Sequence, residues 1–211
     1  MASLVFKHAS VDIRADLGEF SESKTAAILQ AITPDFPEDM KVPFQGAIVR
    51  RSADKSNLIA VTKGRITLSQ VGAEGHVPEH YLPVVRNILE KCLVDTVKSV
   101  SIAWSGEDQS VEGDAAETCR RQLDNDAAES FFSGSVEAVG FHLFLTGDGW
   151  VGDARLEPMA RDKSKFFASF EVVLRKPIEA KAICPSLAEK AKEQVAGAVQ
   201  GALARLGLQG A

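Results

Sequence analysis

The sequence predicts an α+β protein with about eight antiparallel strands, in one sheet or two, and with its helices on one face. Three observations support this: apolar and polar residues alternate in eight short segments, turn-like sequences connect most consecutive strands, and four segments repeat apolar residues at helical spacing. The 211 residues, 45% hydrophobic and 25% charged, have the composition of an average globular protein. A chain of this length can bury a core without disulfides.

The first half of the chain, residues 1–95, predicts the order strand, helix, three strands, helix. Residues 4–17 alternate between apolar and polar side chains, which is typical of a strand. A short helix follows from Ser21 and is stopped by Pro34. The remaining elements are three strands joined by turns and a helix with a wide apolar stripe, at residues 43–51, 57–62, 65–71 and 79–95.

The second half, residues 96–211, predicts the same order of elements. A strand at 98–104 precedes a helical pattern at 113–132. Three strands and a closing helix follow, at residues 139–145, 150–157, 166–174 and 186–207. Because no residue identity accompanies this β-α-β-β-β-α repeat, an internal duplication and a chance similarity both explain it. Whether the halves form one continuous domain stays open.

Charge and cysteine content restrict the classes of partner. The net charge of −5 disfavours binding to nucleic acid. Eight acidic residues between 107 and 129 predict either a solvated helix face or a docking face for a basic partner. The three cysteines lack a CxxC spacing and have apolar neighbours, which indicates buried, free thiols. With no apolar run of 18 residues, the chain predicts no membrane span, and we expect a cytoplasmic protein.

Catalytic and cofactor motifs are weak in this sequence. The segment 76–80 (HVPEH) matches a zinc-peptidase pattern, but Pro78 separates its two histidines, so we expect no metal site. The glycines at 147, 149 and 152 lie between two strands and predict a hairpin turn instead of a phosphate loop. We therefore expect no cofactor and assign no catalytic residue. An enzyme with dispersed catalytic groups remains an alternative, and its first candidates are His8, His142, Asp153 and Glu171.

Two groups of side chains are candidates for binding. Arg50, Arg51 and Arg65 fall on adjacent predicted strands and would form an anion site if they converge. His142, Trp150 and Arg155 are candidates for lining a ligand pocket between the sheet and the last helix. Ordinary mixed surface charge and core packing explain the same residues without a ligand.

The order of elements, together with residues 49–54 (VRRSAD) and 58–69 (LIAVTKGRITLS), resembles a sporadically distributed family of uncharacterised bacterial proteins. In that family a similar hairpin precedes an amphipathic helix and a strand, and the chain ends with a strand and a long helix. The resemblance implies a two-part α+β fold in a bacterial cytoplasm. It implies no activity and no functional residues.

Our leading hypothesis is a non-enzymatic binding module that offers its sheet face or its acidic helix to a protein partner. The alternative is a small-ligand-binding protein with a cavity between the sheet and the C-terminal helix. A sheet edge left open after the last strand can pair with a symmetry mate, so the sequence is also compatible with a homodimer.

Overall fold

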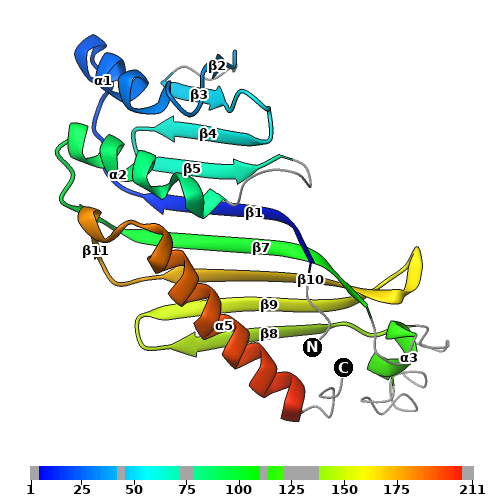
Figure 1. Ribbon diagram of the computed structural model, residues 1–211. Coiled ribbons are helices and arrows are strands. Elements are labelled where there is room, and N and C mark those ends of the chain that lie inside the picture. Colours follow the sequence, from blue (N-terminus) through cyan, green and yellow to red (C-terminus); the bar gives the residue numbers. More distant parts are fainter. Residues whose placement is uncertain (1–4, 42–45, 72–77, 110–113, 121–137, 206–211) are drawn as a thin grey trace.

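The computed structural model, which describes residues 5–41, 46–71, 78–109, 114–120 and 138–205, contains a nine-stranded antiparallel sheet (Figure 1). Its spatial order is β2-β3-β4-β5-β1-β7-β10-β9-β8. The strands are β1 (Val5–Arg14), β2 (Glu38–Asp39), β3 (Ala47–Arg51), β4 (Asn57–Thr62), β5 (Arg65–Gln70), β7 (Ser99–Gln109), β8 (Phe141–Gly147), β9 (Trp150–Met159) and β10 (Asp162–Leu174). The predicted α+β class is confirmed, and the ninth strand, β2, is two residues long, too short to produce an alternating pattern.

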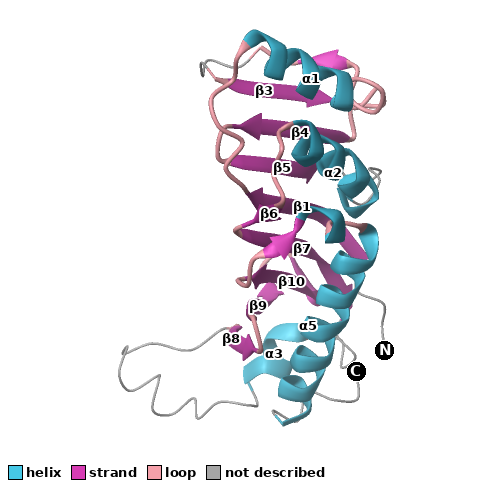
Figure 2. Ribbon diagram, turned by 90° about the vertical axis from the view of Figure 1, so that its left-hand side faces the viewer, coloured by secondary structure: helices cyan, strands magenta, loops and turns pink. Residues whose placement is uncertain are grey.

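The helices cover one face of this sheet. They are α1 (Glu22–Ile32), α2 (Leu82–Lys91), α3 (Ala115–Arg120) and α5 (Pro185–Arg205), with two short 3₁₀ helices, η1 (Pro78–Tyr81) and η2 (Ala180–Ala182). In the edge-on view α1, α2 and α5 lie on the same side, and no described helix lies on the other (Figure 2). Most of the predicted acidic helix, from residue 121 onward, falls outside the described residues.

The two halves of the chain meet at the centre of the sheet. Strand β1 pairs with β7, and from this pair the strands follow outward as β5, β4, β3 on one side and β10, β9, β8 on the other. This mirrored order is what a two-fold relation between the halves produces. The halves share the sheet and a single main cluster of buried apolar residues, to which both β1 and β7 contribute. A two-residue strand pair, β6 (Thr96–Val97) with β11 (Ile178–Glu179), joins the segments before β7 and after β10.

Strand alternation separates the sheet into two chemically different faces. On β1, Val11 and Ile13 are at most 1% exposed and face the helices, whereas Ser10 and Asp12 point the other way. The helix-covered face carries the core, because burial of its branched side chains removes apolar surface from water. We call the opposite face of the nine-stranded sheet the open face.

The hairpin between β8 and β9 has the predicted turn. Gly149 has a φ of +80°, a conformation that favours glycine, and a Cβ there would come within 2.8 Å of the Lys176 side chain. Lys176 in turn donates a hydrogen bond from Nζ to the Asp148 carboxylate at 2.7 Å. The turn thus places β8 as the outermost strand of the second half.

Candidate functional site: the open sheet face

Two rows of side chains cross the middle of the open face. The strand register places each residue opposite the next on the neighbouring strand. Members of a row lie on one face, since directly opposite residues in antiparallel strands point to the same side. The first row is Ser69, Ser10, Ala103, Glu171, Asp153 and Phe144, and the second is His8, Ser105, Ser169, Arg155 and His142.

A hollow of about 330 Å³ lies over these rows, between β5 and β9. Five small side chains on its floor leave this space empty: Ser10, Ser69, Ala103, Ser105 and Ser169. The longer side chains around them belong to His8, Gln70, Asp153, Arg155 and Glu171. The hollow is therefore open, with polar groups among its lining side chains, and it takes residues from five neighbouring strands.

The floor of the hollow offers free hydroxyl groups. Four serine side chains form no hydrogen bond to any residue that the structure describes: those of Ser10, Ser69, Ser105 and Ser169. A hydroxyl group can donate one hydrogen bond and accept two. Four such groups on adjacent strands can therefore satisfy the polar groups of a bound molecule.

The charges at the rim differ in how far they are already neutralised. Asp153 accepts a hydrogen bond from His142 Nε2 at 2.8 Å, and its other oxygen lies 3.4 Å from Arg155 Nε. The His142 ring lies 4.3 Å from the Phe144 ring. Glu171 instead accepts a hydrogen bond from Ser101 Oγ at 2.6 Å and forms no ion pair with any described residue. Glu171 is thus the carboxylate at the rim whose charge is not neutralised.

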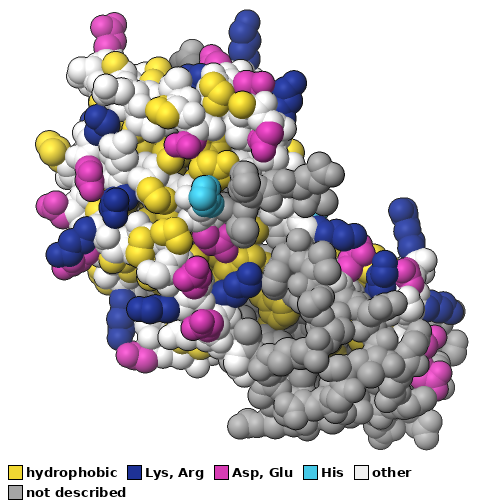
Figure 3. Space-filling view, viewed as in Figure 1, with side chains coloured by type: hydrophobic (Ala, Val, Ile, Leu, Met, Phe, Trp, Pro, Cys, Tyr) yellow, Lys and Arg dark blue, Asp and Glu magenta, His cyan; other side chains and the backbone are white. Residues whose placement is uncertain are grey.

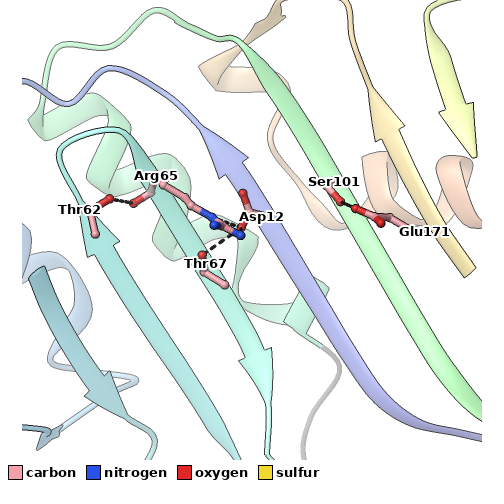
Figure 4. Close-up of polar contacts among 6 residues, drawn as sticks. All are labelled: Asp12, Thr62, Arg65, Thr67, Ser101 and Glu171. Carbon is pink, nitrogen blue, oxygen red and sulfur yellow. Dashed lines mark hydrogen bonds and ion pairs between the residues drawn. The ribbon is translucent and has the colours of Figure 1, made fainter. Parts of the chain in front are cut away.

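A second polar network borders the hollow on the side of β5. Figure 4 shows Asp12 on β1 between Arg65 and Thr67 of β5, with the Ser101–Glu171 hydrogen bond on the neighbouring strands. The Arg65 guanidinium forms an ion pair with Asp12, and Thr67 Oγ1 donates to the same carboxylate at 3.1 Å. Arg65 therefore has a carboxylate partner within the chain.

The three arginines of the predicted anion site do not converge. Arg50 Nε donates to the backbone oxygen of Phe36 at 2.8 Å, after the end of α1. Its neighbour Arg51 points to the opposite face, opposite Glu38 of β2, and Arg65 is paired with Asp12. Alternation along β3 explains the separation of Arg50 from Arg51, and the pairing partners of a strand are not visible in its own sequence.

The three predicted ligand-binding residues divide between the two faces. His142 and Arg155 lie directly opposite each other on the open face, beside the hollow. Trp150 packs against the main core on the helix-covered face, over Gly147 and Gly152. Positions 150 and 155 on β9 differ by an odd number, so their side chains point in opposite directions. The hollow that holds Arg155 lies on the face opposite to α5.

The four candidates for a dispersed active site all lie on the open face. His8, Asp153 and Glu171 line the hollow, and His142 contacts Asp153. The geometry brings a histidine and a carboxylate together, but within the described residues no hydroxyl or thiol hydrogen-bonds to His142 as a nucleophile would. The arrangement can hold and orient a polar ligand.

Sequence reasoning missed the serines of the hollow and the role of Glu79. Three of the serines occupy polar positions of predicted strands and Ser105 directly follows the predicted strand 98–104, and that recurrence is the signal that could have indicated a common face. Glu79, from the segment that resembles a zinc motif, is 9% exposed and accepts a hydrogen bond from Trp104 Nε1 at 2.8 Å. It thereby anchors η1 to the middle of the sheet.

A second hollow of about 330 Å³ lies where β8 begins, and residues 138–142 of the chain line it together with Glu157 and Pro158 of β9. The helix-covered face shows positive and negative side chains interspersed over its described part (Figure 3). Among the described residues, no three His, Cys, Asp or Glu side chains are grouped closely enough to hold a metal ion. A search of the described helices finds none with the length and apolar content of a membrane span. No protein-family model matches the chain, and no curated protein matches it significantly.

Proposed function

We propose that this protein is a non-enzymatic binding module that receives a protein partner on its open sheet face. The observation that carries the proposal is the hollow, in which four serine hydroxyls lie beside the Glu171 carboxylate; within the described residues the hydroxyls form no side-chain hydrogen bond and Glu171 forms no ion pair. A binding surface needs such groups to be available, because polar groups that are already paired gain little from a ligand.

The chemistry of the hollow favours a partner segment with a basic side chain. Glu171 lies at the rim without an ion pair, and Glu157 on β9 likewise has no described partner. A lysine or arginine of the partner would pair with Glu171 while the serine hydroxyls bond to its backbone. The net charge of −5 would also accelerate association with a basic partner.

An exposed aromatic side chain adds an apolar anchor next to these carboxylates. Phe167 on β10 is 39% exposed and lies opposite Glu157 and Glu107 on the open face. Large aromatic side chains contribute disproportionately to binding energy at protein interfaces. The combination indicates a partner segment that contains both basic and apolar residues.

The experiment measures binding of two fluorescently labelled peptides to the protein by fluorescence anisotropy. Both peptides carry Phe and Leu at the same positions; one has Lys residues between them and the other has Glu residues. We expect the Lys peptide to bind and the Glu peptide not to bind. Ser169→Tyr, which fills the hollow, and Glu171→Gln should each weaken binding about tenfold or more, as loss of a central interface contact does.

Thr146→Tyr is the matched control, because it adds the same ring to the open face on β8, outside the hollow. Its affinity should equal that of the unmodified protein. Equal binding of both peptides, or full binding by Ser169→Tyr, would reject the hollow as the site.

A small polar ligand is the second candidate, and the size of the hollow favours it. A volume of about 330 Å³ is at the lower end of the range for ligand sites. Native mass spectrometry of protein purified gently from its host separates the two candidates. A constant excess of a few hundred daltons over the 22.6 kDa chain would favour the ligand, and Ser169→Tyr should remove that excess.

We also propose a bacterial cytoplasmic origin, which is supported by the resemblance of residues 49–54 and 58–69 to a family of uncharacterised bacterial proteins.

A further inference from the structure

Strand β8 (Phe141–Gly147) forms one edge of the nine-stranded sheet, and no described strand pairs with its outer side. The last long strand, β10, lies between β7 and β9, so the open edge is not at the end of the chain as the sequence suggested. The other edge is β2, with two residues. β8 is therefore the longer of the two edges, and within the described residues its outward side is open to a further strand.

The sequence of β8 lacks the features that protect edge strands from pairing. Natural edges commonly carry lysine, proline or a bulge. The seven residues FHLFLTG contain none of these side chains, and the pairing of β8 with β9 is regular throughout. Phe144 in the middle is 77% exposed on the open face. An unprotected edge with an exposed aromatic residue is a site for strand addition.

We infer that β8 pairs antiparallel with β8 of a second copy of this chain, about a two-fold axis at Phe144. In this register Phe144 lies opposite its own mate, and Leu143 lies opposite Leu145. His142 then lies opposite Thr146, and Phe141 opposite Gly147. Aromatic and aliphatic pairs directly across antiparallel strands are favourable, and this register places no two like charges opposite each other.

A second copy fits this edge better than an unrelated strand does, because the edge complements itself. The seven residues have a central phenylalanine and matched leucines on either side of it. The sheet already contains an antiparallel strand pair that connects two halves with the same order of strands, namely β1 with β7. The same operation at β8 would extend one continuous sheet.

The dimer leaves the hollow accessible. A two-fold axis perpendicular to the sheet keeps both open faces on the same side. The hollow is centred on β1, β7 and β10, and β9 separates it from β8. Failure of peptide binding and failure of dimerisation are therefore separate results, obtained with different variants.

The first test is the mass of the full chain in solution, measured by light scattering after size exclusion across a wide range of concentrations. We expect twice the 22.6 kDa of one chain. Phe144→Lys should give a monomer with unchanged circular dichroism, because this exposed side chain contributes little to the fold and two lysines would face each other. Phe167→Lys, on the internal strand β10, is the matched control and should stay dimeric.

The second test fixes the register by mild oxidation of single cysteine variants. Phe144→Cys should give a disulfide-linked dimer, because the opposed Cα atoms would lie about 4.5–5.5 Å apart, within the range that a disulfide spans. Thr146→Cys should not, because its opposite residue is His142 of the other copy. The unmodified chain under the same oxidant accounts for the native cysteines. A monomer at every concentration, a dimer that survives Phe144→Lys, or equal cross-linking of both variants would overturn the inference.

Discussion

The two halves of the molecule contribute strands to one sheet, yet the helices bury the strands of the two halves to different extents. In the first half, Ile59 on β4 and Leu68 on β5 are at most 1% exposed and belong to the main core, on the sheet face that α1 and α2 cover. In the second half, Leu143 and Leu145 on β8 are only partly buried. Among the side chains of α5 that the structure describes, the buried ones are small, namely Ala188 and Ala191. The first half therefore supplies most of the tightly packed core, and the second half keeps surface available for contacts.

The largest difference between the halves should appear on truncation of matched leucines. Leu68→Ala removes a fully buried side chain and should lower the free energy of unfolding by about 3 kcal/mol. Leu145→Ala, on the same face of an outer strand, should cost about 1 kcal/mol because part of that side chain already contacts water. Urea denaturation followed by circular dichroism measures both. Equal losses would contradict the unequal cover.

Loss of the hydrogen bond between Trp104 and Glu79, which connects the two halves, should cause the next largest decrease in the free energy of unfolding. Glu79→Ala leaves the indole N–H of Trp104, a residue that is 2% exposed, without the acceptor that now lies at 2.8 Å. An unpaired buried donor costs about 1–3 kcal/mol. Glu79→Gln keeps an acceptor oxygen and should lose clearly less in the same denaturation experiment. If Ala and Gln variants are equally stable, the hydrogen bond contributes nothing.

Two carboxylates of the open face, Asp12 and Glu171, should differ less in their contribution to the free energy of unfolding. Asp12→Asn removes the ion pair with Arg65 and should cost less than about 1 kcal/mol, with a loss that shrinks at high salt. Glu171→Gln should leave the free energy of unfolding nearly unchanged, since Glu171 has no described ion pair. Denaturation at low and high salt compares them. A salt-dependent loss in Glu171→Gln would reveal a cation partner and weaken the proposed site.

The smallest expected effect is a difference in thiol reactivity between the two cysteines whose side chains the structure describes, Cys92 and Cys184. Burial raises the pKa of Cys92, as expected for an inert core thiol. The expectation of a buried thiol is wrong for Cys184, which is partly exposed just before α5. The Ser186 hydroxyl, 3.1 Å from Sγ, and the backbone N–H groups of Leu187 and Ser186 hold the pKa of Cys184 below its usual value.

A lower pKa gives more thiolate at neutral pH, so iodoacetamide should alkylate Cys184 well before Cys92. The rate at Cys184 should rise with pH and level off below the pKa of a free thiol. Ser186→Ala removes the strongest stabilising contact and should shift that midpoint to higher pH. Peptide mapping by mass spectrometry measures each site separately. The Cys119 side chain falls outside the described residues.

Several features of the candidate site follow from local sequence patterns. The alternation along residues 4–17 predicts His8 and Ser10 on the polar side of a strand, and the structure confirms that they share the open face. Alternation is a property of one strand, so it can be read without knowing the partner strand. It predicts which residues of one strand share a face.

Other features depend on how the strands are ordered. The hollow exists because β1 lies next to both β5 and β7, and β10 lies next to β7, which brings Ser69, Ser10, Ser105 and Ser169 together. Arg50 and Arg65 fall on adjacent predicted strands, which suggested a common site, but their partners, the Phe36 carbonyl and Asp12, come from other elements. Such long-range pairings leave no pattern within a single segment.

The sequence by itself determined the class of fold and the eight long strands, because these depend on periodicity and turn residues. Only the tertiary structure decided the order of the strands, the shared core of the two halves, the position of β8 at the edge and the hollow on the open face. These depend on contacts between residues far apart in the chain, and the free energy of such contacts is set by packing in three dimensions.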